Sequence, residues 1–347
     1  MSGRADHGEK IKEKLYWLTA TKPEIVSEYC NALFASKEPT TCQAYVSAVC
    51  DLIDYCADIP TYYDVRKLNE SNVAEYMYDF RYRKQPDGSI REIGISRVQA
   101  QWSALNNFFN YLKRRGIKSN NPMELIERPS GRSLPKHIPI TAEELRLLLK
   151  AIKAGKRNLR KGVPITEEWI ARDYAIALLL ITTGMRREAL VEIDVGEFDD
   201  EEGVLTVTDK RHKTFRYELN PKVIAAIHDW MRYRKDILLK RHRDENSATV
   251  QRIINNGPLF IGMEGDRISA YKVRENLIDY FKSVSDKPIS PHRLRAAFCT
   301  LYYEETKDIF AVQKAVGHSS PYITQRYIDN IENQQKKATN YMSKLVM

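Results

Sequence analysis

Arginine and histidine residues that could bind a phosphate occur in the second half of this 347-residue sequence. Arg186 follows a Thr-Gly-Met segment, and Arg295 ends a His-Arg-Leu-Arg segment that begins at His292. A phosphodiester is anionic and resists nucleophilic attack, so a site that cleaves it must neutralise the charge that builds up on the non-bridging oxygens. Guanidinium groups are always charged and match the geometry of phosphate oxygens. We therefore predict that Arg186 and Arg295 clamp a phosphate.

A tyrosine nucleophile would make the chemistry of such a site reversible. Attack of a phenol on phosphorus forms a phosphotyrosyl ester, which retains the bond energy needed to rejoin the strand. This step needs no metal, and the sequence offers no carboxylate cluster suited to two-metal chemistry. We expect neither a metal ion nor another cofactor. The departing 5′-oxygen needs a proton, which a lysine on a hairpin can deliver.

Four short motifs occur in a fixed order, although each motif alone is a weak signal. They are Thr183-Gly-Met-Arg186, Asp209-Lys210, His292-Arg-Leu-Arg295, and Gly317-His318 followed by Thr324-Gln-Arg-Tyr327. About a hundred residues separate the first arginine from the motif that begins at His292, and His318 precedes Tyr327 by nine positions. In motif order and spacing, the sequence resembles the tyrosine recombinase (phage integrase) family from about Pro23 to Tyr327.

This resemblance implies a role for each motif residue. Tyr327 would be the nucleophile, and Lys210 would protonate the leaving 5′-oxygen, with Lys213 as the alternative. His292 would exchange the tyrosine proton or hydrogen-bond the phosphate, and His318 would donate a further hydrogen bond. The predicted catalytic set is Arg186, Lys210, His292, Arg295, His318 and Tyr327.

Each of these residues, taken alone, has a simpler interpretation. The sequence has 55 Lys and Arg and 20 Tyr residues, so a single arginine is usually a surface charge and a single tyrosine usually contributes to packing. We interpret the following residues in this way: Arg293, Arg326, Tyr302, Tyr303 and Tyr322. The joint pattern favours the catalytic interpretation for the motif residues.

The sequence departs from the family pattern at two positions. Members usually carry an acidic residue three positions after the first arginine, where this chain has Ala189 and where Glu188 lies one position earlier. A different side chain is therefore expected to hold Arg186. The residue after Arg295 is often histidine in the family and is Ala296 here. Neither departure changes the predicted catalytic set.

Composition favours a polyanionic partner. The net charge is +9, with basic and acidic residues interspersed, so a binding surface must be assembled by folding. The five cysteines show no CxxC pair and no metal-ligand spacing, which indicates reduced thiols. The N-terminus has no apolar signal core, and no run reaches the ~18–20 apolar residues of a membrane span. We expect a cytoplasmic, nucleoid-associated protein with no membrane partner.

Apolar periodicity predicts helices in the first part of the chain, with a turn at Gln85–Ser89. The helices are expected to begin near Pro23, Thr40, Asn69 and Ser96, and the last of them ends at Gly116. Four prolines predict an extended linker over 121–139. A capping box at Thr141 then opens a mainly helical second part.

One β hairpin interrupts the second part. Residues 204–207 and 215–219 have strand composition, and a basic segment joins them. The predicted fold is mainly α with a small β hairpin, as a two-domain DNA clamp of a helical core-binding domain and a mixed catalytic domain. The expected divisions are an N-terminal extension, the core-binding domain, a linker, the catalytic domain and a C-terminal tail, at residues 1–22, 23–120, 121–139, 140–330 and 331–347.

The resemblance implies double-stranded DNA as substrate and a homotetramer on paired sites that exchanges strands through a Holliday junction. An accessory DNA-bending or directionality protein is a further candidate partner. By the same resemblance the tail docks on a neighbouring protomer, whereas its amphipathic pattern also suits folding back on its own domain. Related chemistry in a type IB topoisomerase or telomere resolvase, and a catalytically silent DNA-binding protein, remain alternatives.

Overall fold

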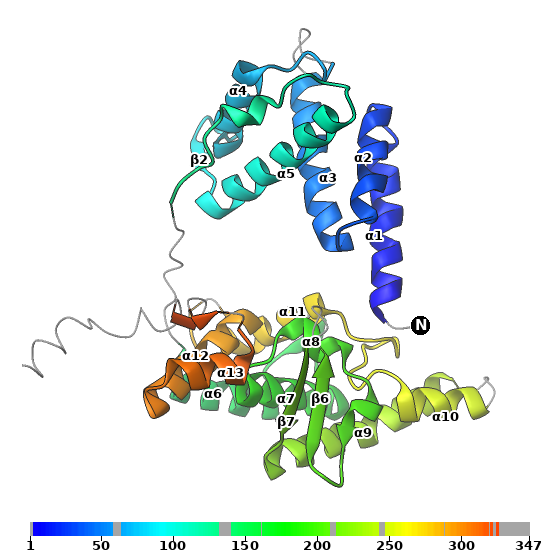
Figure 1. Ribbon diagram of the computed structural model, residues 1–347. Coiled ribbons are helices and arrows are strands. Elements are labelled where there is room, and N and C mark those ends of the chain that lie inside the picture. Colours follow the sequence, from blue (N-terminus) through cyan, green and yellow to red (C-terminus); the bar gives the residue numbers. More distant parts are fainter. Residues whose placement is uncertain are drawn as a thin grey trace, which may run out of the picture. The chain divides into compact units, whose positions relative to one another are not determined.

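The structure is a computed structural model. In it the chain folds into two compact units, Met1–Pro135 and Lys136–Met347 (Figure 1). The described residues are 3–57, 64–131, 140–160, 162–208, 213–242, 247–287, 289–318, 320–321 and 324–325. Among them, no helix combines the length and the apolar character that crossing a membrane requires.

Helices build the first unit. They are α1 (Gly3–Thr19), α2 (Glu24–Phe34), α3 (Pro39–Ala57), α4 (Glu70–Arg81) and α5 (Ile95–Arg114). Helix α3 packs against α1, α2 and α5, and the fully buried Leu52, Leu105 and Phe108 lie in the core. The short antiparallel strands β1 (Tyr82–Lys84) and β2 (Ile90–Glu92) flank the predicted turn. The four helices expected from periodicity are present within one or two residues of their predicted starts.

Helix α1 is absent from the sequence prediction, which treats residues 1–22 as an extension. Ile11 and Leu15 are buried in the core of the first unit, and α1 contacts both α2 and α3. These two residues are four positions apart and therefore lie on the same face of the helix. Two apolar residues among polar neighbours are a weak sequence signal for a helix, although both residues pack in the core beside α3.

The segment predicted as a linker packs against the first unit over its first half. A 3₁₀ turn, η1 (Pro122–Glu124), is buried at Pro122 and Met123, and the indole Nε1 of Trp102 donates to the carbonyl of Ile126 at 2.9 Å. Gln99 Nε2 donates to the Pro129 carbonyl at 2.8 Å. Residues 121–131 are thus tied to α5. The rest of the predicted linker, 132–139, lies outside the described residues.

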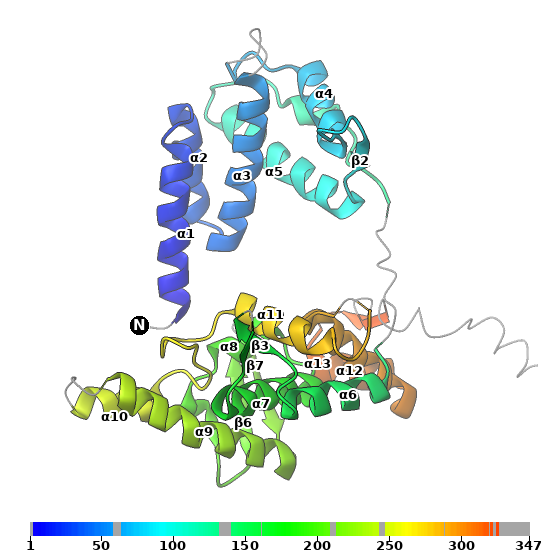
Figure 2. The same ribbon diagram turned by 180° about the vertical axis from the view of Figure 1, so that it is seen from behind.

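The second unit is built around the buried helix α7 (Glu167–Thr183), which packs against α6 (Ala142–Lys153), α9 (Pro221–Arg241), α11 (Ala270–Phe281) and α12 (Pro291–Thr306) (Figures 1 and 2). The remaining helices are α8 (Arg187–Glu192), α10 (Ser247–Asn256) and α13 (Ile309–Val316). The predicted capping box at Thr141 begins α6, where the Thr141 side chain accepts from Glu144 N at 3.2 Å. Two minor elements are the β3–β4 pair (Asn158–Arg160, Val163–Pro164) and η2 (Val195–Glu197).

A three-stranded antiparallel sheet lies beside these helices, in the order β5 (Phe198–Asp199), β6 (Val204–Thr208) and β7 (Thr214–Glu218). Val204, Leu205 and Val207 of β6 are buried, and Leu205 and Val207 belong to the core of the unit. The hairpin strands β6 and β7 lie within one residue of the predicted strands, whereas the two-residue β5 is too short for a sequence pattern. The predicted mainly α fold with a small hairpin sheet is confirmed.

Candidate active site

A left-handed glycine ends α7 and turns the chain toward Arg186. Gly184 has φ 60°, and a Cβ atom at this position would lie 2.6 Å from Cδ1 of Phe298. A side chain here would therefore be strained by the backbone and blocked by the ring. The tight turn places Arg186 at the start of α8, where its side chain is half-buried.

Helix α12 presents two of the predicted residues on one face. Ser290 caps this helix by accepting from the backbone N–H of Arg293, and Pro291 occupies the first turn. His292 and Arg295 are three positions apart, so they share a helix face. His292 is exposed, whereas Arg295 is only 4% exposed.

Arg295 joins two helix ends through its guanidinium group. Nη1 donates to the carbonyl of Gly184 at 2.7 Å, and Nη2 donates to the carbonyl of Val316 at 2.8 Å. Both acceptors lie at helix C-termini, where carbonyl groups lack partners within the helix and carry partial negative charge. These bonds fix the orientation of the guanidinium group and leave its full positive charge in place.

His318 follows a second left-handed glycine, Gly317, which has φ 68°. The imidazole is buried, and its Nδ1 lies 2.8 Å from Oγ1 of the fully buried Thr324. Burial lowers the pKa of His318 to about 4, and the nearby positive charges of Arg295, Arg186 and His292 add to this effect. His318 is therefore neutral at neutral pH and can offer a hydrogen bond without adding charge.

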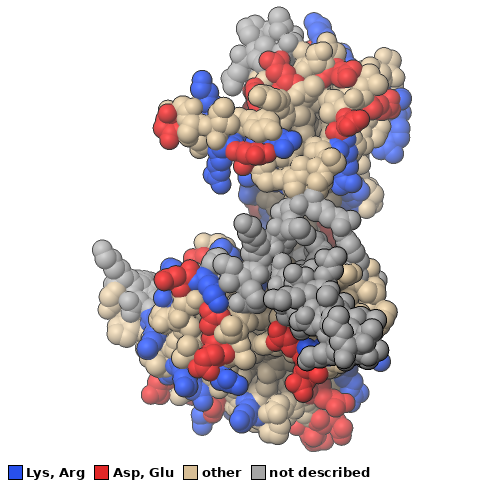
Figure 3. Space-filling view, turned by 90° about the vertical axis from the view of Figure 1, so that its left-hand side faces the viewer, with Lys and Arg blue, Asp and Glu red and all other residues tan. Residues whose placement is uncertain are grey.

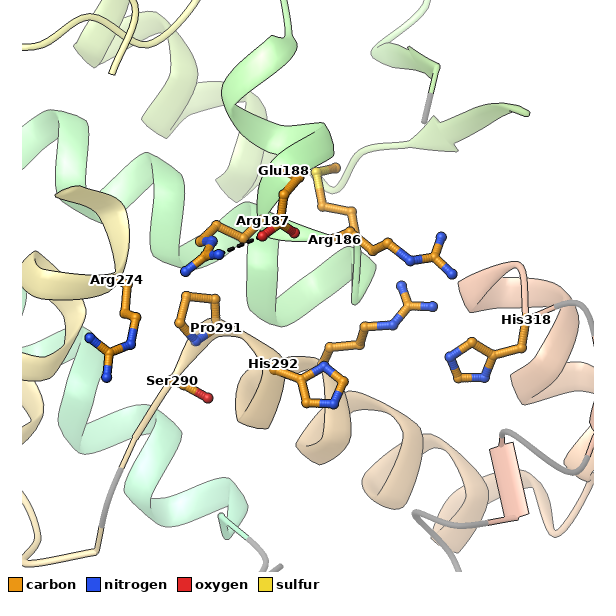
Figure 4. A pocket seen from close by; sticks show the side chains of 10 residues that line it. Arg186, Arg187, Glu188, Arg274, Ser290, Pro291, His292 and His318 are labelled. Carbon is orange, nitrogen blue, oxygen red and sulfur yellow. Dashed lines mark hydrogen bonds and ion pairs between the residues drawn. The ribbon is translucent and has the colours of Figure 1, made fainter. Parts of the chain in front are cut away.

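Four of the six predicted catalytic residues line one pocket of about 440 Å³. Figure 4 shows Arg186 and His318 toward one end of this pocket, Arg274 at the other end and His292 between them. The described lining consists of Met185, Arg186, Arg187, Glu188, Arg274, Ser290, Pro291, His292, Arg295 and His318. The other two predicted residues, Lys210 and Tyr327, lie outside the described residues.

The pocket concentrates positive charge. Its described lining includes four arginines and one carboxylate, Glu188, which pairs with Arg187 (Figure 4). On the face seen in Figure 3, by contrast, basic and acidic side chains are interspersed on both units. A pocket wall with an excess of positive charge attracts an anion. No cluster of metal-ligating side chains occurs within the described part of the chain.

Sequence reasoning did not find Arg187, Arg274 and Ser290 in the pocket wall. Arg187 directly follows the motif residue Arg186, so the sequence alone could have placed it near the pocket. Arg274 lies on α11, which only the fold brings beside α8. At the position of the usual acidic residue, Ala189 is buried, and the neighbouring Glu188 pairs with Arg187.

Guanidinium and imidazole groups around a pocket on a mainly helical unit are suited to binding a phosphate ester. Residues 140–334 match the phage integrase family. The chain therefore belongs to this family, as the motifs predict, and its enzyme class is that of the tyrosine recombinases.

A sequence relative agrees with this assignment, and two solved structures share the fold. The tyrosine recombinase XerC of Alcanivorax borkumensis is 31% identical over 232 residues, which cover 66% of this chain and 67% of the relative. The fold is similar to that of the XerH site-specific recombinase bound to a palindromic difH substrate, with TM-score 0.63, 18% identity and coverage of 97% of this chain and 94% of that one. A lambda integrase tetramer bound to a Holliday junction gives TM-score 0.60 at 14% identity, with 89% and 78% of the two chains covered.

Proposed function

We propose that this tyrosine recombinase cleaves double-stranded DNA at specific sites through a 3′-phosphotyrosyl link to Tyr327, and rejoins the strands after exchange. The observation that supports this proposal most is the arginine-rich pocket, in which Arg186, His292, Arg295 and His318 come together from three separate sequence motifs. A pocket with this charge is suited to phosphate groups of the DNA backbone.

The two arginines stabilise the charge that develops on the non-bridging oxygens. Arg295 is already oriented by its carbonyl partners, so little reorganisation is needed when the transition state forms. Arg186 contributes a second guanidinium from the start of α8. Neutral His318 donates a hydrogen bond to the phosphate through the ring nitrogen that does not face Thr324.

Proton transfers accompany the bond changes. The phenol oxygen of Tyr327 attacks phosphorus, its proton passes to His292, and the bond from phosphorus to the 5′-oxygen breaks. Lys210, on the connection between β6 and β7, gives a proton to the departing oxygen, so that a free 5′-hydroxyl results. Rejoining reverses each step with the 5′-hydroxyl of the exchanged strand as nucleophile.

We extend the assembly of a relative to this chain. Lambda integrase forms a tetramer bound to a Holliday junction. By analogy, four protomers of this chain would hold two DNA sites and exchange strands in pairs through such a junction. A DNA-bending or directionality protein would act as an accessory partner. DNA as substrate favours a cytoplasmic, nucleoid-associated location.

A nicked suicide substrate tests the nucleophile. Wild-type protein should accumulate a covalent protein–DNA adduct, and Tyr327→Phe should form none while keeping its affinity for the site, because only the attacking oxygen is lost. Tyr322→Phe, five positions earlier, is the matched control and should still form the adduct. Adduct from the Tyr327→Phe protein would refute the assignment, and no adduct from wild type would indicate a silent DNA-binding protein.

A plasmid with two sites tests the exchange step. Recombinant products support the proposal, whereas relaxation without recombination would indicate a topoisomerase-like enzyme. Hairpin ends would indicate a telomere resolvase.

A further inference from the structure

The ring of Phe215 on β7 lies directly against Gly317. A Cβ atom at Gly317 would be 2.1 Å from Cε1 and 2.2 Å from Cζ of Phe215, far inside any van der Waals contact. The ring therefore occupies the space that a side chain at position 317 would fill. Since Gly317 also has φ 68°, the backbone conformation and the packing both require glycine.

The glycine under this ring lies between two parts of the active site. Before it, the carbonyl of Val316 accepts a hydrogen bond from Arg295 at 2.8 Å. After it, His318 lines the pocket. Its backbone N–H donates to the carbonyl of Gln313, and its own carbonyl accepts from Nε2 of Gln313, both at 3.1 Å. A group that packs on Gly317 therefore touches the segment that positions both side chains.

The same ring belongs to the β6–β7 hairpin, one register pair from the connection between its strands. Phe215 pairs with Val207 in the strand register, and the next pair, Thr208 and Thr214, joins its hydroxyl groups at 3.1 Å. The ammonium group of Lys213 lies 5.2 Å from the centroid of the Phe215 ring, within the range of a cation–π contact. Phe215 is thus a residue through which the hairpin, close to its connection, contacts the Gly317 turn beside the pocket.

We propose that Phe215 is a positioning residue that fixes the β6–β7 hairpin against the Gly317 turn, so that the general acid carried by the hairpin reaches the leaving 5′-oxygen. This inference rests on the proposed role of the hairpin lysine. The edge of the Phe215 ring can approach a glycine Cα closely, whereas a shorter side chain would leave a gap and let the hairpin shift. A misplacement of about 1 Å can slow a reaction by about 10²-fold.

A substrate with sulfur in place of the bridging 5′-oxygen separates this role from a structural one. A thiolate leaving group has a pKa near ~8.5 and needs no acid, unlike an alkoxide. Phe215→Ala should cleave the ordinary nicked substrate about 10²-fold more slowly than wild type and should regain most of the wild-type rate on the sulfur substrate. Phe215→Leu, which fills part of the same space with an apolar side chain, should lose less rate than Phe215→Ala on the ordinary substrate. Site affinity, measured by gel shift, should be unchanged in both variants.

Phe298 provides the matched control. Its ring covers the other left-handed glycine of the site, Gly184, but it lies on α12 and not on the hairpin. Phe298→Ala should disturb the turns that hold Arg186 and Arg295, so its loss of rate should persist on the sulfur substrate. Thermal unfolding of both variants identifies any general loss of folding.

Lys210→Ala separates failure of this inference from failure of the proposed function. If the sulfur substrate restores Lys210→Ala but not Phe215→Ala, Phe215 only supports the pocket wall and the inference is overturned. If it restores Phe215→Ala and Lys213→Ala but not Lys210→Ala, Phe215 keeps its role and the acid is Lys213. If it restores none of the three, both the hairpin acid and the role of Phe215 are overturned.

Discussion

Two regions of the second unit bury arginine side chains, and they differ in how the charge is balanced. Away from the pocket, the buried carboxylate of Asp173 is shared by several donors. Arg157 and Arg172 form ion pairs with it, Asn276 Nδ2 donates to it at 3.1 Å, and the Tyr280 hydroxyl donates to it at 3.2 Å. These contacts join α7 to α11 and to the chain after α6. The carboxylate balances much of the arginine charge, so this cluster is structural.

The pocket balances its arginines in another way. The partners of Arg295 described above are the backbone carbonyls of Gly184 and Val316, which orient the guanidinium without neutralising it. The carboxylate in the described lining, Glu188, pairs with Arg187. The comparison shows that burial of arginine alone does not mark an active site. The pocket differs because its described lining holds more arginines than carboxylates, which favours the binding of an anion.

The largest effect is expected from a substitution that disrupts the Asp173 cluster. Asp173→Ala should lower the free energy of unfolding by about 3–5 kcal/mol, because it leaves buried guanidinium groups without their carboxylate. Chemical denaturation of the full chain measures this loss. The control is Asp229→Ala, since Asp229 and Arg232 form an exposed pair 2.9 Å apart, and such pairs contribute about 0–1 kcal/mol. Equal losses in the two variants would remove the structural role assigned to Asp173.

The next effect concerns catalysis. Arg186→Ala and Arg295→Ala should each slow cleavage by about 10²–10³-fold, the usual scale for loss of one donor to a transition state. Single-turnover cleavage of the nicked substrate measures the rates. Arg293→Ala is the matched control, since Arg293 lies on the same helix, is half-buried and is absent from the described pocket lining. An equally slow Arg293→Ala protein would mean that the wrong arginine of the motif has been chosen.

Four of the motif residues, Arg186, His292, Arg295 and His318, lie together around one pocket, and their catalytic roles stay a prediction. Strand composition located the hairpin. Sequence could not reveal Asp173 as a shared acceptor, since its partners Asn276 and Tyr280 lie about a hundred residues away and carry no periodic signal. For the same reason, the sequence did not predict that Arg274 lies in the pocket wall or that Phe215 packs on Gly317. Contacts between distant segments depend on packing, which local patterns do not encode.

A smaller effect follows from the buried histidine of the pocket. In an unfolded chain His318 takes up a proton near its ordinary pKa of about 6.5, whereas the folded protein lowers this pKa to about 4. Between these two pH values the unfolded state binds more protons than the folded state. The contribution of His318 to stability is therefore full above pH ~6.5 and is lost as the pH falls toward ~4. The free energy of unfolding changes by at most about 1.4 kcal/mol per pH unit in this range. Denaturation of wild type and His318→Gln across this range should give a shallower slope for the variant. Identical slopes would contradict a buried neutral imidazole.

The smallest effect concerns the far end of the pocket, where Arg274 lies beyond the residues predicted to bind the cleaved phosphate (Figure 4). Its guanidinium is 3.3 Å from Glu275 and its side chain is 44% exposed, so it is available to a second backbone phosphate at little desolvation cost. Arg274→Ala should weaken DNA binding a few-fold irrespective of sequence and reduce the slope of log affinity against log salt by about 0.9, the contribution of one phosphate contact. Lys282, at the other end of the same helix and paired with Asp279, is the control, and Lys282→Ala should leave the slope unchanged. Cleavage at saturating DNA should be close to wild type in both proteins, because neither side chain touches the reacting phosphate. A slower cleavage step in Arg274→Ala with an unchanged salt slope would instead place Arg274 beside Arg186 and Arg295 in the transition state, and the pocket would then bind one phosphate along its whole length.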